Sequence, residues 1–255
     1  SNKMHYKEFK KMTNINYLKI KIFADGADLD EIKILNKNKY IKGFTTNPSL
    51  MKKAGIKDYK EFAITLLSEI KDKPISFEVF SDDIIEMEKQ AEEIASWSEN
   101  VNVKIPITNT KKESTEELIR KLSSKGIICN ITAIFTVEQV KNIIGVLDKS
   151  TPAILSIFAG RIADTGIDPS QIIGESISLA KSKPEAEVLW ASTRENLNIF
   201  QADEIGCHII TVPHDLLKKM SQLGKNLEEF SLETVNSFYM DACSAGYKIK
   251  IKNEI

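Results

Sequence analysis

Apolar and polar residues alternate with a period of two in short runs along most of this chain, most regularly at residues 101–110. Apolar residues at 101, 103 and 105 alternate with Asn102 and Lys104, and Pro106 ends the run. This pattern is typical of a β-strand. Similar runs begin near Ile20, Ile41, Ile75, Val101, Ile127, Ala153, Glu187 and His208.

Amphipathic stretches with helical spacing separate most of these runs. They span residues 58–71, 83–97, 114–125, 136–147, 169–181 and 194–205, and a shorter polar one spans 28–39. Two predicted helices begin with capping boxes, in which side chains bind the free amides of the first turn. These pairs are Ser114 with Glu117 and Thr136 with Gln139. Two further helices are predicted at 213–223 and 227–247.

Strand followed by helix eight times in about 250 residues predicts an α/β protein with a single closed (β/α)8 TIM barrel. An open doubly wound sheet would have fewer strands or a glycine-rich phosphate motif, and the sequence contains neither G-x-G-x-x-G nor a Walker sequence. We expect one domain over residues 1–255, with a peripheral segment at 1–17. The extra C-terminal helices, residues 213–250, would cap the barrel mouth or form a subunit interface.

Composition agrees with one large core and excludes several classes of function. The 255 residues are 42% hydrophobic, and 35 basic against 36 acidic residues give a net charge of -1. Such scattered, balanced charge predicts no nucleic-acid or membrane partner. Three cysteines far apart and three histidines favour neither a disulfide framework nor a zinc site. Without a long apolar run or a signal-peptide pattern, we expect a cytoplasmic protein.

Lys104 is the first candidate for chemistry, because the alternation points it away from the apolar side of its strand. Burial disfavours the charged form of an amine, and a neutral lysine amine can attack a carbonyl carbon. Lys104 is therefore the candidate Schiff-base nucleophile. The alternative is an exposed lysine on an edge strand, which is the usual situation of an arbitrary lysine.

The other strands decide between these alternatives, because the same period gives each an inner face with polar residues near its end. Late strand ends form the active-site face of such barrels, so these side chains should converge on one pocket. A single polar group could be a hydrogen-bonded core residue, but the set together favours a catalytic site. The inward positions are Phe23, Asp25, Thr45, Asn47, Ser76, Glu78, Ile128, Asn130, Thr132, Ile154, Ser156, Phe158, Val188, Trp190 and Ser192.

An amine beside carboxylates and hydroxyls suits Schiff-base chemistry on a ketose. Forming the imine releases water, so a carboxylate and a hydroxyl must relay protons, and Glu78 and Thr132 lie on the strands next to Lys104. Cleaving a carbon–carbon bond then needs a base, for which Asp25 is our choice.

Neutral groups would bind the sugar, and cationic groups its phosphate. The predicted substrate-binding residues are Thr45, Asn47, Asn130, Ser156, Phe158 and Trp190. Arg161 and Arg194 follow the sixth and seventh strands and, with Ser192, predict a phosphate clamp. Such barrels more often bind phosphate after the seventh and eighth strands. The alternative for either arginine is an ion pair at the rim.

Four motifs in chain order resemble those of the transaldolase family. They are Gly43-Phe-Thr-Thr-Asn-Pro-Ser-Leu50, Val103-Lys-Ile-Pro106, Asn130-Ile-Thr132 and Phe158-Ala-Gly-Arg-Ile162, and the similarity extends from Phe23-Ala-Asp25-Gly to Ile210-Thr-Val-Pro213. The resemblance implies a Schiff base on Lys104, with Asp25 as general acid and base. It also implies that Glu78 and Thr132 position the catalytic water.

The resemblance extends to ligands. It implies that Asn47, Asn130 and Ser156 bind a dihydroxyacetone unit, and that the phosphate is bound by Arg161, Ser192 and Arg194. Sugar phosphates are then the expected partners, with no metal or other cofactor, and a homo-oligomer is a further expectation. Pro106 is similar to the small fructose-6-phosphate aldolase branch, whereas Ile157 stands where a proline is common.

Two enzymatic hypotheses follow. The first is a transferase that moves a dihydroxyacetone unit from a ketose phosphate to an aldose phosphate, and the alternative is a lyase that releases dihydroxyacetone. The small aldolases carry tyrosine and glutamine in place of Phe158 and Glu78, so this chain has the transferase version of both. A non-catalytic binding barrel is the third hypothesis, disfavoured because such a protein could lose the lysine and carboxylates. The acceptor and the pathway stay open.

Overall fold

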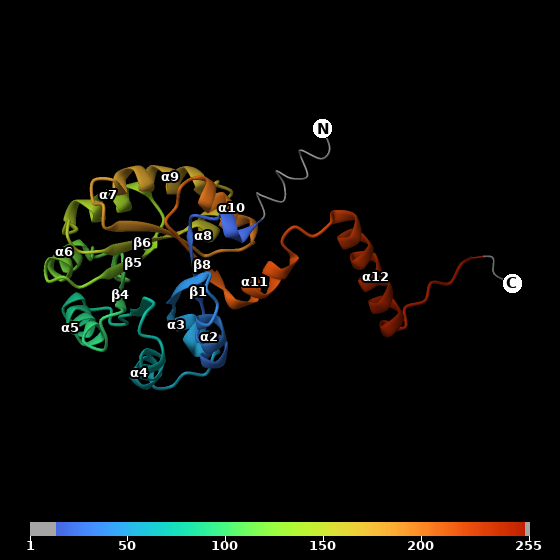
Figure 1. Cartoon of the computed structure of the whole chain (residues 1–255), viewed down its shortest axis with the longest axis horizontal. Coiled ribbons are helices and arrows are strands. Elements are labelled where there is room, and N and C mark those ends of the chain that lie inside the picture. Colours follow the sequence, from blue (N-terminus) through green and yellow to red (C-terminus); the bar gives the residue numbers. More distant parts are fainter. Residues whose placement is uncertain (1–13, 253–255) are drawn as a thin grey trace. The chain divides into compact units, whose positions relative to one another are not determined.

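Eight parallel strands form a closed barrel in the computed structural model, which describes residues 14–252 (Figure 1). Each strand pairs with its neighbours in chain order, and β1 closes onto β8. The predicted (β/α)8 fold is thereby confirmed. The strands are β1 (Lys21–Asp25), β2 (Ile41–Thr45), β3 (Ile75–Glu78), β4 (Val101–Pro106), β5 (Cys129–Ile134), β6 (Ala153–Phe158), β7 (Ala186–Ala191) and β8 (Ile209–Pro213).

Helices follow the strands and surround them (Figure 1). The helices at predicted places are α2 (Leu29–Asn36), α4 (Tyr59–Glu69), α5 (Ile84–Ala95), α6 (Glu116–Ser124), α7 (Val137–Val146), α9 (Pro169–Ala180), α10 (Leu197–Glu204), α11 (His214–Lys218) and α12 (Leu227–Ala245). Two short helices, α3 (Pro48–Lys53) and α8 (Ala159–Asp164), are additional, as is the 3-10 turn η1 (Ile15–Tyr17). The 3-10 turn η2 (Lys219–Gln222) lies in the second part of the helix predicted at 213–223. Both short helices directly follow strand ends that carry predicted site residues.

One of the two predicted capping boxes is correct. Thr136 accepts a hydrogen bond from the amide of Gln139, whose side chain in turn accepts from the amide of Thr136. The box at Ser114 is wrong, because the N-cap residue of α6 is Thr115, one residue later, and its side chain makes no capping hydrogen bond. The Thr115 hydroxyl donates instead to the carbonyl oxygens of Pro106 and Ile107, which ties the start of α6 to the end of β4.

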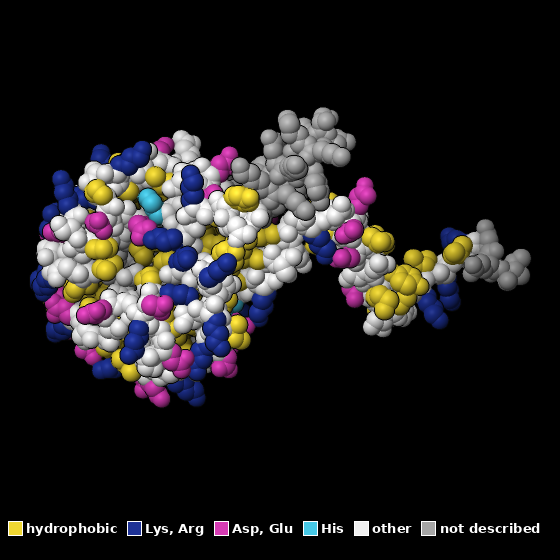
Figure 2. All heavy atoms as spheres, viewed as in Figure 1, with side chains coloured by type: hydrophobic (Ala, Val, Ile, Leu, Met, Phe, Trp, Pro, Cys, Tyr) yellow, Lys and Arg dark blue, Asp and Glu magenta, His cyan; other side chains and the backbone are white. Residues whose placement is uncertain are grey.

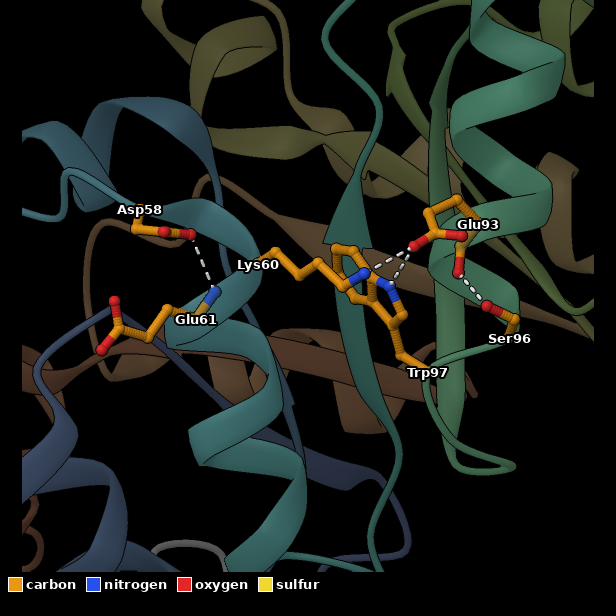
Figure 3. A network of polar contacts seen from close by, with 6 residues as sticks. All are labelled: Asp58, Lys60, Glu61, Glu93, Ser96 and Trp97. Atoms are coloured by element: carbon orange, nitrogen blue, oxygen red, sulfur yellow. Dashed lines mark hydrogen bonds and ion pairs between the residues drawn. The ribbon is translucent and has the colours of Figure 1, made fainter.

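Neighbouring helices of the outer layer are joined by exposed ion pairs. In Figure 3, Glu93 of α5 accepts from the Nζ of Lys60 in α4 at 2.9 Å and from the indole of Trp97 at 3.3 Å. Asp58 caps α4 by accepting from the amide of Glu61. Exposed pairs of this kind contribute at most about 1 kcal/mol each, so burial of the apolar helix faces is the main stabilising factor.

The inner core of the barrel shows that one predicted strand face is wrong. Phe23, Ile154, Leu189, Ala191 and Ile209 pack together inside, and Phe158 packs against them. Leu189 and Ala191 are therefore the inward residues of β7, whereas the sequence analysis placed Val188 and Trp190 there. Both faces of this strand are apolar and buried, so alternation carried no information about which face is inner.

The described residues divide into two compact units, one of residues 16–220 and one of residues 14–15 and 221–252. The first contains the barrel, and lysines, arginines and acidic side chains are interspersed over its visible face (Figure 2). The second contains α12, whose apolar side chains, such as Phe230, Val235 and Phe238, are exposed. The single domain and the homo-oligomer stay predictions. Among the helices of residues 14–252, none is long and apolar enough to cross a membrane.

Candidate active site

A cavity of about 440 Å³ opens at the carboxyl ends of the strands, and most of the predicted site residues line it. Those that line it are Asp25, Thr45, Asn47, Glu78, Lys104, Thr132, Ser156, Phe158, Arg161 and Ser192. Asn130 lies beneath its surface, fully buried. Trp190 and Arg194 do not line this cavity but lie together at a second one.

Lys104 lies on β4 with its side chain inside the barrel, only 7% exposed. Its Cα is in register with Glu78 of β3 on one side and Asn130 of β5 on the other. The Nζ donates a hydrogen bond of 3.0 Å to the carbonyl oxygen of Thr46. This contact fixes the amine at the cavity, across from strands β1 and β2.

Asp25 ends β1, and a side chain of the next strand orients its carboxyl group. The Thr45 hydroxyl donates to Oδ1 of Asp25 at 2.9 Å and also contacts the hydroxyl of Thr211 in β8. Burial raises the pKa of Asp25, while the charge of Lys104 and the hydrogen bond from Thr45 lower it less strongly. The carboxyl group therefore holds a proton more readily than an exposed aspartate does.

Glu78 ends β3 and is the second carboxyl group at the amine. Burial raises its pKa, and the charge of Lys104 opposes this more weakly. The Tyr59 hydroxyl donates to the backbone carbonyl of Glu78 at 2.8 Å, which fixes the end of the strand. Two carboxyl groups with raised pKa values beside one lysine form a site that can both give and take protons.

A chain of hydrogen bonds crosses the inside of the barrel under the cavity. The Nδ2 of Asn130 donates to the hydroxyl of Ser76 at 3.0 Å, and the Ser156 hydroxyl donates to Oδ1 of Asn130 at 2.6 Å. Strands β3, β5 and β6 are thereby joined through side chains. Asn130 orients Ser156 toward the cavity instead of lining it.

Asn47 and Thr132 reach the cavity through local features of the backbone. Asn47 caps α3, because its Oδ1 accepts from the amide of Leu50 at 2.8 Å and Pro48 occupies the first helical position. After Thr132, Ala133 has a positive φ of 60°, and the register between β5 and β6 shifts. Such a bulge redirects the chain beside a site.

The first turn of α8, directly after β6, packs tightly on the end of β7. A Cβ at Gly160 would lie 1.8 Å from the carbonyl oxygen of Ser192, so only glycine fits there. Ser192 has a positive φ of 58°, and it lies past the end of β7, out of phase with the strand. This explains why it lines the cavity although the predicted face of its strand was wrong.

Arg161 and Arg194, predicted as a pair, line different cavities. Arg161 lines the main cavity, whereas Arg194 forms an ion pair of 2.8 Å with Asp164 at the second cavity of about 380 Å³. Trp190 is directed to that second cavity on the outside of β7. Its predicted position on the inner face is wrong, because the inward positions belong to Leu189 and Ala191.

The sequence analysis missed lining residues of β8 and α3, among them Thr211 and Leu50. The period-two reading would have found Thr211 if it had been extended to the eighth strand, because the inward Ile209 precedes it by two. Leu50 belongs to a helix too short to have a periodic signal. Within residues 14–252, no group of three or more His, Cys, Asp or Glu is arranged to hold a metal ion.

Comparison with known proteins agrees with this geometry. The sequence family described as Transaldolase/Fructose-6-phosphate aldolase matches residues 22–251. A relative from Dehalococcoides mccartyi named "Probable transaldolase" is 39% identical over 204 residues, covering 80% of this chain and 91% of its own. One of the same name from Thermoanaerobacter sp. is 36% identical over 79% of this chain and 89% of its own.

A solved structure supports the fold alone. A crystal structure from Coccidioides immitis, whose description names a fructose-1,6-biphosphate aldolase, has a TM-score of 0.51 and 10% identity, covering 82% of this chain and 76% of that one.

The raised pKa of Asp25 gives a testable stability effect. A carboxyl group of this kind contributes stability below its unfolded pKa of about 3.9, and loses it as the pH rises through its folded value. Above about pH 3.9 this stability is lost progressively, so Asp25→Asn should raise the urea midpoint at pH 7. The difference in urea midpoint between Asp25→Asn and the wild type should become smaller as the pH falls through the folded-state pKa of Asp25.

Asp82 is the matched control of opposite sign. Hydrogen bonds from the hydroxyl and amide of Thr110 lower its pKa, so its stabilising effect is present at neutral pH and is lost on acidification. Asp82→Asn should lower the midpoint at pH 7. An Asp25→Asn protein less stable than the wild type at pH 7 would contradict the assignment.

Proposed function

Because this chain belongs to the transaldolase/fructose-6-phosphate aldolase family, we propose that it transfers a dihydroxyacetone unit from a ketose phosphate to an aldose phosphate through a Schiff base on Lys104. The observation that carries this proposal is the enclosure of the Lys104 amine at one cavity with two carboxyl groups whose pKa values burial raises. An amine between proton donors is what imine formation and hydrolysis require.

Formation of the Schiff base is the first step that we propose. The neutral amine of Lys104 attacks the ketose carbonyl carbon, and the resulting carbinolamine loses its hydroxyl group as water. Glu78, with its raised pKa, is available to protonate that hydroxyl. Thr132 lines the same cavity and would hold the departing water. The product is a protonated imine.

Carbon–carbon cleavage is the second step. The Asp25 carboxylate takes the proton of the hydroxyl on the second carbon from the imine carbon. That carbon becomes an aldehyde as its bond to the donor fragment breaks, and the electron pair neutralises the imine as an enamine on Lys104. Reaction of the enamine with an aldose phosphate reverses these steps and completes the transfer.

Neutral side chains would hold the donor. We assign its hydroxyls to Ser156, which Asn130 orients, to Thr45 and to the side-chain amide of Asn47. Phe158 lines the cavity and stacks on Phe135, with 5.8 Å between the ring centroids, so it gives the enamine an apolar wall. Such a wall supplies no proton, which supports transfer over release.

The phosphate is assigned mainly to Arg161 together with Ser192, since both line the cavity. Arg194 would have to leave Asp164 to reach the same phosphate. This geometry makes Arg161 the principal cation of the predicted clamp and Arg194 a secondary one.

The covalent step is tested by reduction. Incubation with fructose 6-phosphate and borohydride should give one adduct, located on Lys104 by peptide mass spectrometry, because hydride converts the imine into a stable amine. Lys104→Ala should abolish the adduct, whereas Lys60→Ala, which removes an exposed lysine of α4, should retain it. An adduct on another lysine would show that the nucleophile is misassigned.

The phosphate assignment is tested by comparing two arginines. A charged hydrogen bond to phosphate contributes about 1.5–3 kcal/mol, so Arg161→Ala should raise KM for phosphorylated sugars by about ten-fold or more. Arg194→Ala should have a smaller effect, and neither should change KM for an unphosphorylated donor. Equal losses with both kinds of donor would mean that Arg161 has a structural role.

The choice between transferase and lyase is tested at Phe158. Without an acceptor, the wild type should release little dihydroxyacetone from fructose 6-phosphate. Phe158→Tyr should increase the release and reduce the transfer, because one positioned proton donor contributes about 10²–10⁴-fold. Phe135→Tyr, which modifies the stacked partner, is the control. Release by the wild type as fast as transfer would identify a lyase.

A further inference from the structure

His214 lies next to the Asp25 end of β1, in helix α11, which contributes no residue to the proposed reaction. Pro213, at the end of β8, is in register with Asp25, and His214 follows it as the first residue of α11. Helix α11 packs against both β8 and β1. The His214 side chain is only 10% exposed, so its ring is enclosed next to the proposed base.

The imidazole ring lies against the backbone of Gly26, the residue after Asp25. A Cβ at Gly26 would be 2.5 Å from Cε1 of His214, 2.6 Å from Nε2 and 2.9 Å from Nδ1. No side chain larger than hydrogen fits between them. The ring therefore supports the peptide that leads out of Asp25.

Glu31 of α2 fixes the orientation of the ring. Its Oε2 is 2.6 Å from Nδ1 of His214, and its Oε1 accepts from Lys218 at 2.6 Å. Hydrogen bonds from Lys218 and His214 lower the pKa of Glu31, so it is a carboxylate at neutral pH and Nδ1 carries the hydrogen. Nε2 is buried and has no hydrogen-bond partner among the described residues.

Asp25 is shared between two cavities. It lines the catalytic cavity together with Lys104, and a second cavity of about 430 Å³ together with His214 and Glu31. Burial raises the pKa of Asp25, whereas Lys104, the Thr45 hydroxyl and, last, His214 lower it. A positive charge on His214 would thus add to that of Lys104 in favouring the ionised form of Asp25, from the second cavity.

We propose that His214, which is anchored by Glu31, is a positioning residue for Asp25. It keeps the Asp25 carboxylate oriented into the catalytic cavity and charged during carbon–carbon cleavage. This inference rests on the proposed function, since it assumes that Asp25 acts as the base. The other charged groups at the second cavity are Asp28, the N-cap of α2, Glu31 of α2, Lys53 of α3, and Asp215 and Lys218 of α11. Lys104 of β4 faces Asp25 from the catalytic cavity.

The test measures Asp25 directly and through activity. His214→Asn can still donate a hydrogen bond to Glu31 but cannot carry a charge. In this variant the carboxyl carbon-13 titration of Asp25, assigned with Asp25→Asn, should move up by about half a pH unit or more, because an opposite charge is lost. The acid limb of the kcat profile should move by the same amount. Glu31→Gln should move the acid limb in the same direction.

His208 provides the matched control. It directly precedes β8, at the opposite end of that strand from His214, and its Nδ1 accepts a hydrogen bond from the amide of Val188. His208→Asn should leave both the Asp25 titration and the acid limb in place. A His214→Asn protein that loses thermal stability and kcat equally at every pH, with an unchanged Asp25 titration, would overturn the inference and leave His214 a packing residue.

Trapping by borohydride separates this inference from the proposed function. The Lys104 adduct does not need Asp25, so His214→Asn should form it as the wild type does. If no adduct forms in the wild type, the proposed function fails, while the Asp25 titration still decides whether His214 controls that carboxylate.

Discussion

The enclosure of the Lys104 amine inside the barrel is the constraint on which the rest of the site depends. Moving a charged group out of water costs several kcal/mol unless other groups compensate. Here the carbonyl oxygen of Thr46 accepts from the amine, and the Asp25 and Glu78 carboxyl groups interact with its charge. The charge of Lys104 therefore lowers the pKa values of both carboxyl groups, against the opposite effect of burial.

Neutral hydrogen bonds hold this charged set in place. Thr45 orients Asp25 from the next strand, and the chain from Ser76 through Asn130 to Ser156 spans the floor of the cavity. Buried polar side chains are tolerated only where their partners are provided, and each of these has one. The inside of this barrel is therefore polar at one end of the strands, and the core formed around Phe23 and Leu189 is apolar.

Much of this arrangement could be predicted from the sequence, because the barrel imposes a regular rhythm on the chain. Predicted strand starts lie close to the observed ones, the largest difference being between Ile127 and Cys129. Periodicity could not give the inner face of β7, since that strand is buried on both sides, nor the partner of Arg194, since ion pairs at a rim depend on loop geometry. His214 had no sequence signal beyond following Pro213, because its importance arises from the closure of β8 onto β1.

The close approach of Gly160 to Ser192 has a consequence for the entropy of ligand binding. The carbonyl oxygen of Ser192 occupies the space that a side chain at Gly160 would need, so the first turn of α8 packs directly on the end of β7. In the proposed phosphate site, this packing leaves the backbone of Arg161 and Ser192 little freedom to lose when an anion binds. Ordering mobile loops weakens association, and a loop pair that is already ordered avoids most of that loss. If the proposed phosphate site is correct, its affinity depends on the packing at Gly160 as well as on charge.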